Sequence, residues 1–146
     1  MKMTDALLCD FATVREGLLH ILGGGITVVS RDTYPSPLNL TLALLIEMER
    51  EDFSDKKTIT VDLADDQSAE RVGGAEVGWD VDDAPSKRHP DVPYTIPFVL
   101  PLPIILPRPS LYTIKLATNG EMARILKFEA LEAEPMVNVT PRSMII

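Results

Sequence analysis

The sequence predicts an all-β fold, a two-sheet antiparallel β-sandwich of about seven to nine strands. Three observations support this prediction. Apolar residues recur at every second position in several separate stretches, which is the side-chain period of a strand and not of a helix. Turn-forming clusters separate these stretches. A single sheet would leave one face of the apolar rows in water, so two sheets are expected to pack face to face.

The composition is that of one globular domain with its own core. The chain has 146 residues, of which 45% are hydrophobic and 25% are charged, and these shares are ordinary for a folded protein. No repeat with a period of about 20–50 residues occurs, which excludes a solenoid or a propeller. We expect residues 1–133 to form the sandwich and residues 134–146 to form a tail or an assembly arm.

The charge and the cysteine count exclude several function classes. The 22 acidic and 14 basic residues give a net charge of −8, which argues against nucleic acid as a partner. A single cysteine excludes an intrachain disulfide, a four-cysteine zinc site and a CxxC redox pair. The chain shows neither a secretory signal nor an apolar run of about 18 residues. We therefore expect a cytoplasmic protein with no membrane partner.

The N-terminal third is expected to form a hairpin. Residues 6–14 and 18–22 are its two arms, with the turn at residues 15–17, and residues 26–31 continue the strand beyond a bend at the glycines 23–25. A helix over residues 11–22 is the alternative, because five apolar residues approximate a helical stripe. The hairpin is favoured because Gly17 lies where a turn needs it.

The clearest alternation lies in the middle of the chain. Between residues 38 and 49 six apolar residues occupy every second position, namely Leu38, Leu40, Leu42, Leu44, Ile46 and Met48. A strand places all of them on one face. Residues 58–63 alternate again, and we expect the two runs to pair as an antiparallel hairpin with a loop near residues 50–57.

The C-terminal half contains a second hairpin. Residues 111–118 and 121–131 flank Asn119-Gly120, a favoured pair for a type I′ turn. The inward set is expected to be Tyr112, Ile114, Leu116, Leu126 and Phe128.

Two further segments precede this hairpin. Residues 93–107 alternate apolar residues with prolines, and since proline cannot donate a ladder hydrogen bond, this segment is expected at a sheet edge. Residues 64–93 are acidic and irregular, with one short strand over 75–81 and a long surface loop over 82–92.

The sequence gives little support for a phosphate-binding loop, a nucleophilic site or a zinc site. Gly23-Gly24-Gly25 lacks the Lys-Ser/Thr pair of a phosphate-binding loop, so the glycines are interpreted as a bend. A nucleophilic site built from Cys9, Asp10 and His20 would need these residues to converge at a pocket. Zinc would have to take most of its ligands from carboxylates.

Acidic loops suggest a calcium or small-ligand site as an alternative function. Ca²⁺ prefers six to eight oxygen ligands, and loops at one end of a sandwich can supply them. The candidate ligands are Asp62, Asp65, Asp66, Asp80, Asp82 and Asp83. The alternative interpretation is that these aspartates form a solvent-exposed negative surface, because no DxDxDG pattern occurs.

Two apolar segments suggest association with a protein. The proline-rich segment 97–109 is expected to be an extended sheet edge, and residues 136–146 carry apolar side chains that the predicted sandwich does not need for its core. Either could bind a partner or a second copy. The alternative is that Ile96, Phe98 and Leu100 cap the protein's own core and that the tail is disordered.

The two ends of the chain resemble a known family. The segments ALLCDFATVREGLLHILGGGITVV and LPRPSLYTIKLATNGEMARILKFEALEA are similar to those of a family of short bacterial proteins of unknown function. The resemblance implies an all-β, sandwich-like domain and brings no activity, cofactor or catalytic residue. Ser110 replaces the glycine that usually precedes the strand of Tyr112, which affects only the turn type.

The function expected from the sequence is therefore that of a non-enzymatic module. We predict an interaction with another protein or self-association as a homo-oligomer, with no catalytic, metal or cofactor-binding residues assigned.

Overall fold

The computed structural model describes residues 1–53, 55–80 and 88–134. Over these residues the chain is all-β, as predicted, with eleven strands and one short 3-10 helix. In chain order the elements are β1 (Lys2–Arg15), β2 (Leu18–Gly24), β3 (Val28–Arg31), β4 (Ser36–Pro37), β5 (Leu40–Met48), η1 (Arg50–Asp52), β6 (Lys57–Asp65), β7 (Arg71–Trp79), β8 (Tyr94–Leu102), β9 (Ile105–Leu106), β10 (Ser110–Thr118) and β11 (Glu121–Glu132). Within the described part of the chain, no helix is long and apolar enough to cross a membrane.

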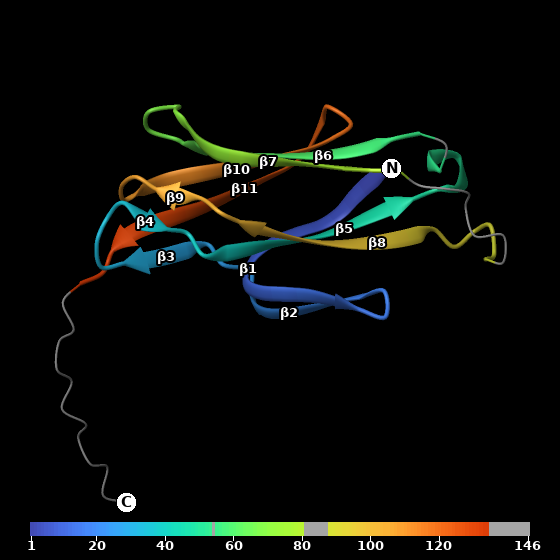
Figure 1. The fold of residues 1–146 in the computed structure, drawn as a ribbon, viewed down its shortest axis with the longest axis horizontal. Helices are drawn as coiled ribbons and strands as arrows, with labels where there is room; N and C mark the ends of the chain where they lie inside the picture. Colours follow the sequence, from blue (N-terminus) through green and yellow to red (C-terminus); the bar gives the residue numbers. More distant parts are fainter. Residues whose placement is uncertain (54, 81–87, 135–146) are drawn as a thin grey trace, which may run out of the picture.

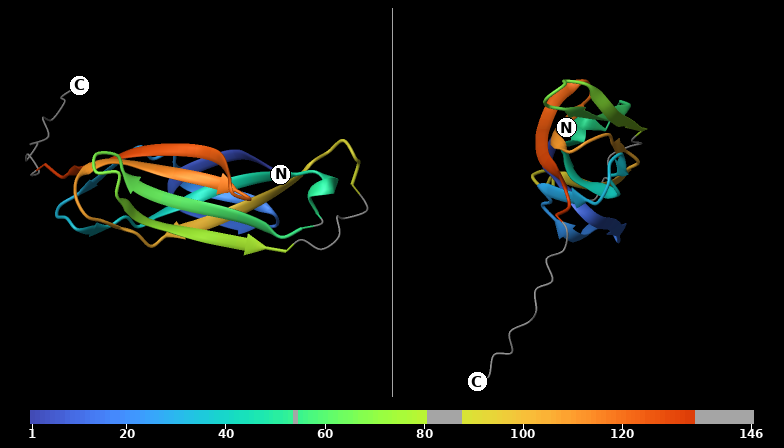
Figure 2. Two further views of the ribbon diagram at one scale, coloured as in Figure 1. Left: turned by 90° about the horizontal axis from the view of Figure 1, so that it is seen from above. Right: turned by 90° about the vertical axis from the view of Figure 1, so that its left-hand side faces the viewer.

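Nine of the strands form two large sheets that enclose the core (Figure 1). The four-stranded sheet has the order β2-β1-β5-β8, and the five-stranded sheet has the order β3-β11-β10-β6-β7. The two-residue strands β4 and β9 pair with each other at one end. Most strands follow the long axis of the molecule (Figure 2). All pairs are antiparallel except β11 with β3, a parallel pair that the prediction of an antiparallel sandwich did not include.

The alternation of apolar residues places the core between the sheets. All six alternating residues of the segment that contains β5 are buried, from Leu38 to Met48, and the opposing sheet contributes Ile59, Leu63 and Ile114. Burying one such side chain contributes about 1.5–3 kcal/mol to folding. The period of two that is visible in the sequence thus defines the inner face of each sheet.

The C-terminal hairpin has the predicted turn and inner face. Asn119 and Gly120 have φ angles of 48° and 80°, as a type I′ turn requires. Tyr112 lies opposite Phe128, and Ile114 lies opposite Leu126. Tyr112 and Phe128 stack with their ring centroids 5.4 Å apart.

The hairpin predicted between residues 38–49 and 58–63 is wrong. β5 pairs with β1 and β8, whereas β6 pairs with β10 and β7 in the other sheet. The 3-10 helix η1 carries the chain from one sheet to the other. Alternation shows which face of a strand is buried, but it does not show which strand is the neighbour.

The proline-rich segment lies at a sheet edge, as predicted. β8 is the last strand of the four-stranded sheet. Ile96, Phe98 and Leu100 pack against the main core, which is the alternative that the sequence left open for these three residues. The predicted strand over 75–81 is β7, which begins earlier, at Arg71. Most of the predicted loop over 82–92 falls outside the described residues.

The N-terminal third forms the predicted hairpin, and the helix considered for residues 11–22 is not present. Glu16 and Gly17 have φ angles of 53° and 73° and join β1 to β2. Residues 2–9 of β1 pair with β5, whereas residues 9–15 pair with β2. β1 bends between these two halves, so the hairpin runs along the outside of its own sheet (Figure 1). Beyond the glycines the chain crosses to β3 in the opposite sheet instead of continuing β2.

Candidate interaction surface

The β1–β2 hairpin has an inner row of side chains that attaches it to the sandwich. Cys9 and Ala12 are buried together with Ala43 of β5, and Leu7, Leu19 and Val99 pack around them. This small second cluster lies on the outer face of the four-stranded sheet. The hairpin is thus held against the sandwich by apolar contacts on one side only.

The outer row of the hairpin is apolar and open to solvent. Phe11 lies opposite Leu22 in the β1–β2 ladder, and their exposed fractions are 56% and 67%. Leu18 is 63% exposed. Phe11 and Leu22, with Thr13 and His20, line an open hollow of about 420 Å³. Contiguous exposed apolar side chains of this kind mark interaction sites more often than scattered ones do.

The free edge of β2 has unpaired backbone groups. The two-residue turn makes Arg15 and Leu18 the closing pair of the hairpin, and the closing pair of such a turn is hydrogen-bonded within the hairpin. The N–H and C=O groups of Leu19 and Ile21 therefore face outward. No strand of the described chain pairs with this side of β2, and residues 18–24 include no proline and no charged residue.

The other edge of the same sheet is protected. Pro97 and Pro101 of β8 lie opposite Leu45 and Thr41 of β5, and a residue without an N–H cannot take part in a hydrogen-bonded pair. The nitrogen atoms of these two prolines therefore face away from β5, toward the free edge. Prolines at such positions block the addition of another strand.

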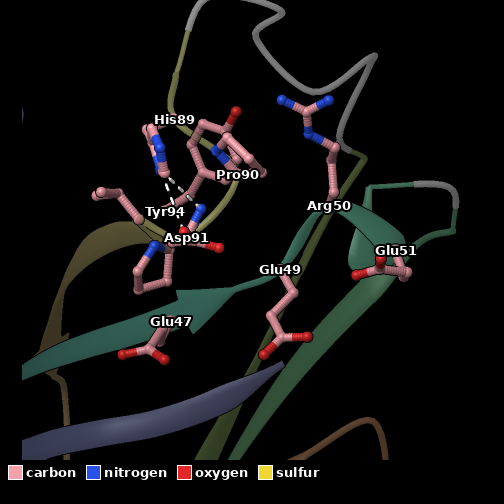
Figure 3. Close-up of a pocket in the computed structure, with 10 residues that line it drawn as sticks. Glu47, Glu49, Arg50, Glu51, His89, Pro90, Asp91 and Tyr94 are labelled. Atoms are coloured by element: carbon pink, nitrogen blue, oxygen red, sulfur yellow. Dashed lines mark hydrogen bonds and ion pairs between the residues drawn. The ribbon is translucent and has the colours of Figure 1, made fainter.

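A second hollow lies at the end of the sandwich where β5 meets η1 (Figure 3). Its volume is about 490 Å³. Glu47 and Glu49 extend into this region from the end of β5, and Glu51 comes from η1. His89 lies 3.6 Å from Asp91 at an exposed position. Among the described residues no group of three or more His, Cys, Asp or Glu side chains could hold a metal ion.

The four described aspartates of the predicted calcium site, Asp62, Asp65, Asp66 and Asp80, do not converge on one point. Asp62 forms an ion pair with Arg71 at 2.7 Å, and Asp66 forms one with Lys127 at 3.0 Å. Asp80 follows β7 at the end that pairs with Lys57, about 25 Å along β6 from Asp65. Asp82 and Asp83 lie outside the described residues.

Asp65 is a buried carboxylate that accepts several hydrogen bonds within the protein. Its side chain is 2% exposed and accepts hydrogen bonds from Ser110 Oγ at 2.7 Å, from the Gln67 amide at 2.9 Å and from Arg108 Nε at 2.8 Å. Burial by itself raises the pKa of Asp65, but these three donors and the Arg108 charge outweigh it and hold the pKa below its ordinary value. A carboxylate with three donors is a satisfied structural group and not an open ligand.

Cys9, Asp10 and His20 are not assembled into a nucleophilic site. Cys9 is fully buried and its Sγ donates to the carbonyl oxygen of Thr41 at 3.3 Å. Burial, together with the nearby Asp10 charge, raises the pKa of the Cys9 thiol. His20 lies in the exposed outer row opposite Thr13, whereas Cys9 lies opposite Gly24.

The exposed face of the hairpin was not predicted from the sequence. The sequence predicts interaction surfaces at residues 97–109 and 136–146, and the second of these segments lies outside the described residues. A signal was present: residues 18–22 read Leu-Leu-His-Ile-Leu, so both rows of this strand are apolar. A strand with one face on a core needs only one apolar row.

Residues 4–130 match the sequence model of a known protein family. The matching family is described as a family of unknown function, DUF6941. The match begins in β1 and ends in β11, so it includes the hairpin and both sheets. The comparison with curated proteins finds no match.

Proposed function

The chain belongs to DUF6941, a family of unknown function, and we propose that it is a non-enzymatic module that associates with a protein through the β1–β2 hairpin. The observation that carries the proposal is the outer row of the hairpin. Phe11, Leu18 and Leu22 are more than half exposed, although the interior of the sandwich is filled by other residues.

Burial of the outer row of the hairpin would favour association. Burying a large apolar side chain contributes about 1.5–3 kcal/mol relative to leaving it in water. Three such side chains on one short hairpin supply a compact centre for an interface, and protein interfaces have apolar centres of this kind. The unpaired backbone groups of Leu19 and Ile21 add hydrogen-bonding capacity at the adjacent edge.

Site-specific photo-crosslinking tests the proposal. A photoreactive phenylalanine analogue replaces Phe11 in the full chain expressed in its native cells. Met122 is the matched control position, because it is 58% exposed against 56% for Phe11 but lies on the other sheet. We expect one discrete crosslinked product from position 11 and none from position 122. The mass of the product shows whether the partner is a second copy or another protein.

If position 11 gives no discrete product, or the same products as position 122, the hairpin is not an interaction surface and the proposal is wrong.

Association through residues 136–146 is the second form of this proposal. It is supported by the apolar character of Met144, Ile145 and Ile146. Changing these three residues to serine in the full chain, followed by light scattering, tests it. Loss of association in this variant, but not in a Phe11→Ser/Leu22→Ser variant, would assign the interface to the tail.

A cytoplasmic location stays a prediction from the sequence.

A further inference from the structure

We infer that β2 pairs with β2 of a second copy of this chain, antiparallel and around a two-fold axis at His20. This inference rests on the proposed function and names its partner. Such pairing would join the four-stranded sheets of two copies into one continuous sheet.

The backbone of β2 is suited to this register. Leu19 and Ile21 direct their N–H and C=O groups to the free edge, as shown by the closing pair of Arg15 and Leu18. A two-fold axis at His20 places Leu19 opposite the partner's Ile21, and Ile21 opposite the partner's Leu19. Each of these two pairs forms two hydrogen bonds. The register also leaves out Gly23, whose φ of 60° departs from a regular strand.

The side chains of β2 are self-complementary about the same point. Residues 18–22 read Leu-Leu-His-Ile-Leu, and in reverse they read Leu-Ile-His-Leu-Leu. In the two-fold pair Leu18 would therefore lie opposite the partner's Leu22 in the outer row, where Phe11 adjoins Leu22. A two-fold interface requires a surface that matches itself in this way. This near-palindrome, in which only Leu19 and Ile21 exchange places, favours a second copy over an unrelated strand.

The charge distribution permits a second copy at this edge. Each copy carries a net charge of −8, so two copies repel each other over most of their surfaces. Residues 18–24 contain no Asp, Glu, Lys or Arg, and an approach along β2 therefore brings no charged side chains of the two strands together.

The other described edges are less suited to pairing. β8 has Pro97 and Pro101 on its free side. β7 carries Arg71 and Glu76, and β3 has only four residues. Charges, prolines and short length are the features that protect sheet edges, and β2 has none of the three.

Cysteine crosslinking tests the register. In the two-fold pair His20 and the partner's His20 form a non-hydrogen-bonded pair, with Cα atoms about 4.5 Å apart. Disulfides need a Cα separation of about 4.4–6.8 Å. We expect His20→Cys, in a full chain with Cys9→Ala, to form a disulfide-linked dimer in air. Met122→Cys in the same background is the control on the other sheet, and it should form no disulfide-linked dimer.

A second variant needs no change at Cys9. His20→Lys would place two ammonium groups opposite each other at the axis, and like charges directly opposite destabilise strand pairing. By light scattering we expect the wild-type chain to dimerise and His20→Lys to raise the dimer dissociation constant by about tenfold or more. Met122→Lys should leave the dissociation constant unchanged.

The outcomes separate this inference from the proposed function. A wild-type dimer that persists in His20→Lys, together with no disulfide in His20→Cys, would overturn the pairing of β2 and leave another interface in place. A monomeric wild-type chain would overturn the inference as well. Crosslinking at position 11 would then decide the proposed function by itself.

Discussion

At the level of single residues, Asp65 connects the end of β6 to the start of β10. It is buried and its carboxylate accepts hydrogen bonds from Ser110, Gln67 and Arg108. We expect Asp65→Asn to lower the free energy of unfolding at pH 7 by about 2–3 kcal/mol, because hydrogen bonds to a buried charged group are lost and Arg108, whose side chain is 47% exposed, loses its ion-pair partner. Urea denaturation measures this change.

The contribution of Asp65 to the free energy of unfolding should decrease as the pH falls. Because its pKa is lower in the folded state than in the unfolded state, its contribution is present above about pH 4, where the unfolded chain also ionises, and is lost as the pH falls through the folded pKa. The wild-type and Asp65→Asn curves should therefore approach each other in acid. Asp62→Asn is the control: its ion pair with Arg71 is exposed, and such pairs contribute at most about 1 kcal/mol. An equal loss in both variants would contradict this account.

Cys9 should react slowly with alkylating reagents. Its thiol is fully buried, and both burial and Asp10 raise its pKa, so little of the reactive thiolate forms at neutral pH. Mass spectrometry after iodoacetamide treatment at pH 7.5 should show a largely unmodified folded chain and complete modification in urea. Rapid alkylation of the folded chain would contradict this prediction and support a nucleophilic role for Cys9.

At the scale of elements, the prolines of β8 prevent another strand from pairing with its free edge. Restoring the N–H groups with Pro97→Thr/Pro101→Thr should create a second open edge and promote aggregation. Turbidity or light scattering at raised temperature measures this tendency. Pro103→Thr is the matched control because it lies beyond the end of β8. Unchanged solubility of the double variant would show that other features protect this edge.

At the scale of the whole molecule, the two sheets should unfold together because one apolar core joins them. Leu44 comes from the four-stranded sheet and Ile114 from the five-stranded sheet, and both are fully buried in the same cluster. We expect Leu44→Ala and Ile114→Ala each to cost about 2–5 kcal/mol, with a single transition retained in both.

The only tryptophan offers a direct measurement of this cooperativity. Trp79 of β7 packs on Phe98 of β8, in the opposite sheet, with ring centroids 4.7 Å apart. Its fluorescence therefore reports contact between the sheets, whereas far-ultraviolet circular dichroism reports the strands. The two signals should give the same denaturation midpoint in the wild type and in both variants. Separate midpoints would mean that one sheet unfolds before the other.

The local features of this fold could be predicted from the sequence. The alternation from Leu38 to Met48 identified a strand and its buried face, and Asn119-Gly120 identified a hairpin turn. Gly17 favoured a turn over a helix in the N-terminal third. Side-chain period and turn chemistry are properties of a few neighbouring residues, so the sequence contains them directly.

The pairing of the strands and the exposure of apolar residues depend on the complete fold. The separation of β5 and β6 into different sheets depends on the other strands that compete for each partner. The exposure of Phe11 and Leu22 depends on the bend in β1, which turns one row of the hairpin outward. Strand neighbours and solvent exposure are set by contacts between distant segments, whereas a sequence pattern reports only which residues share a face of one strand.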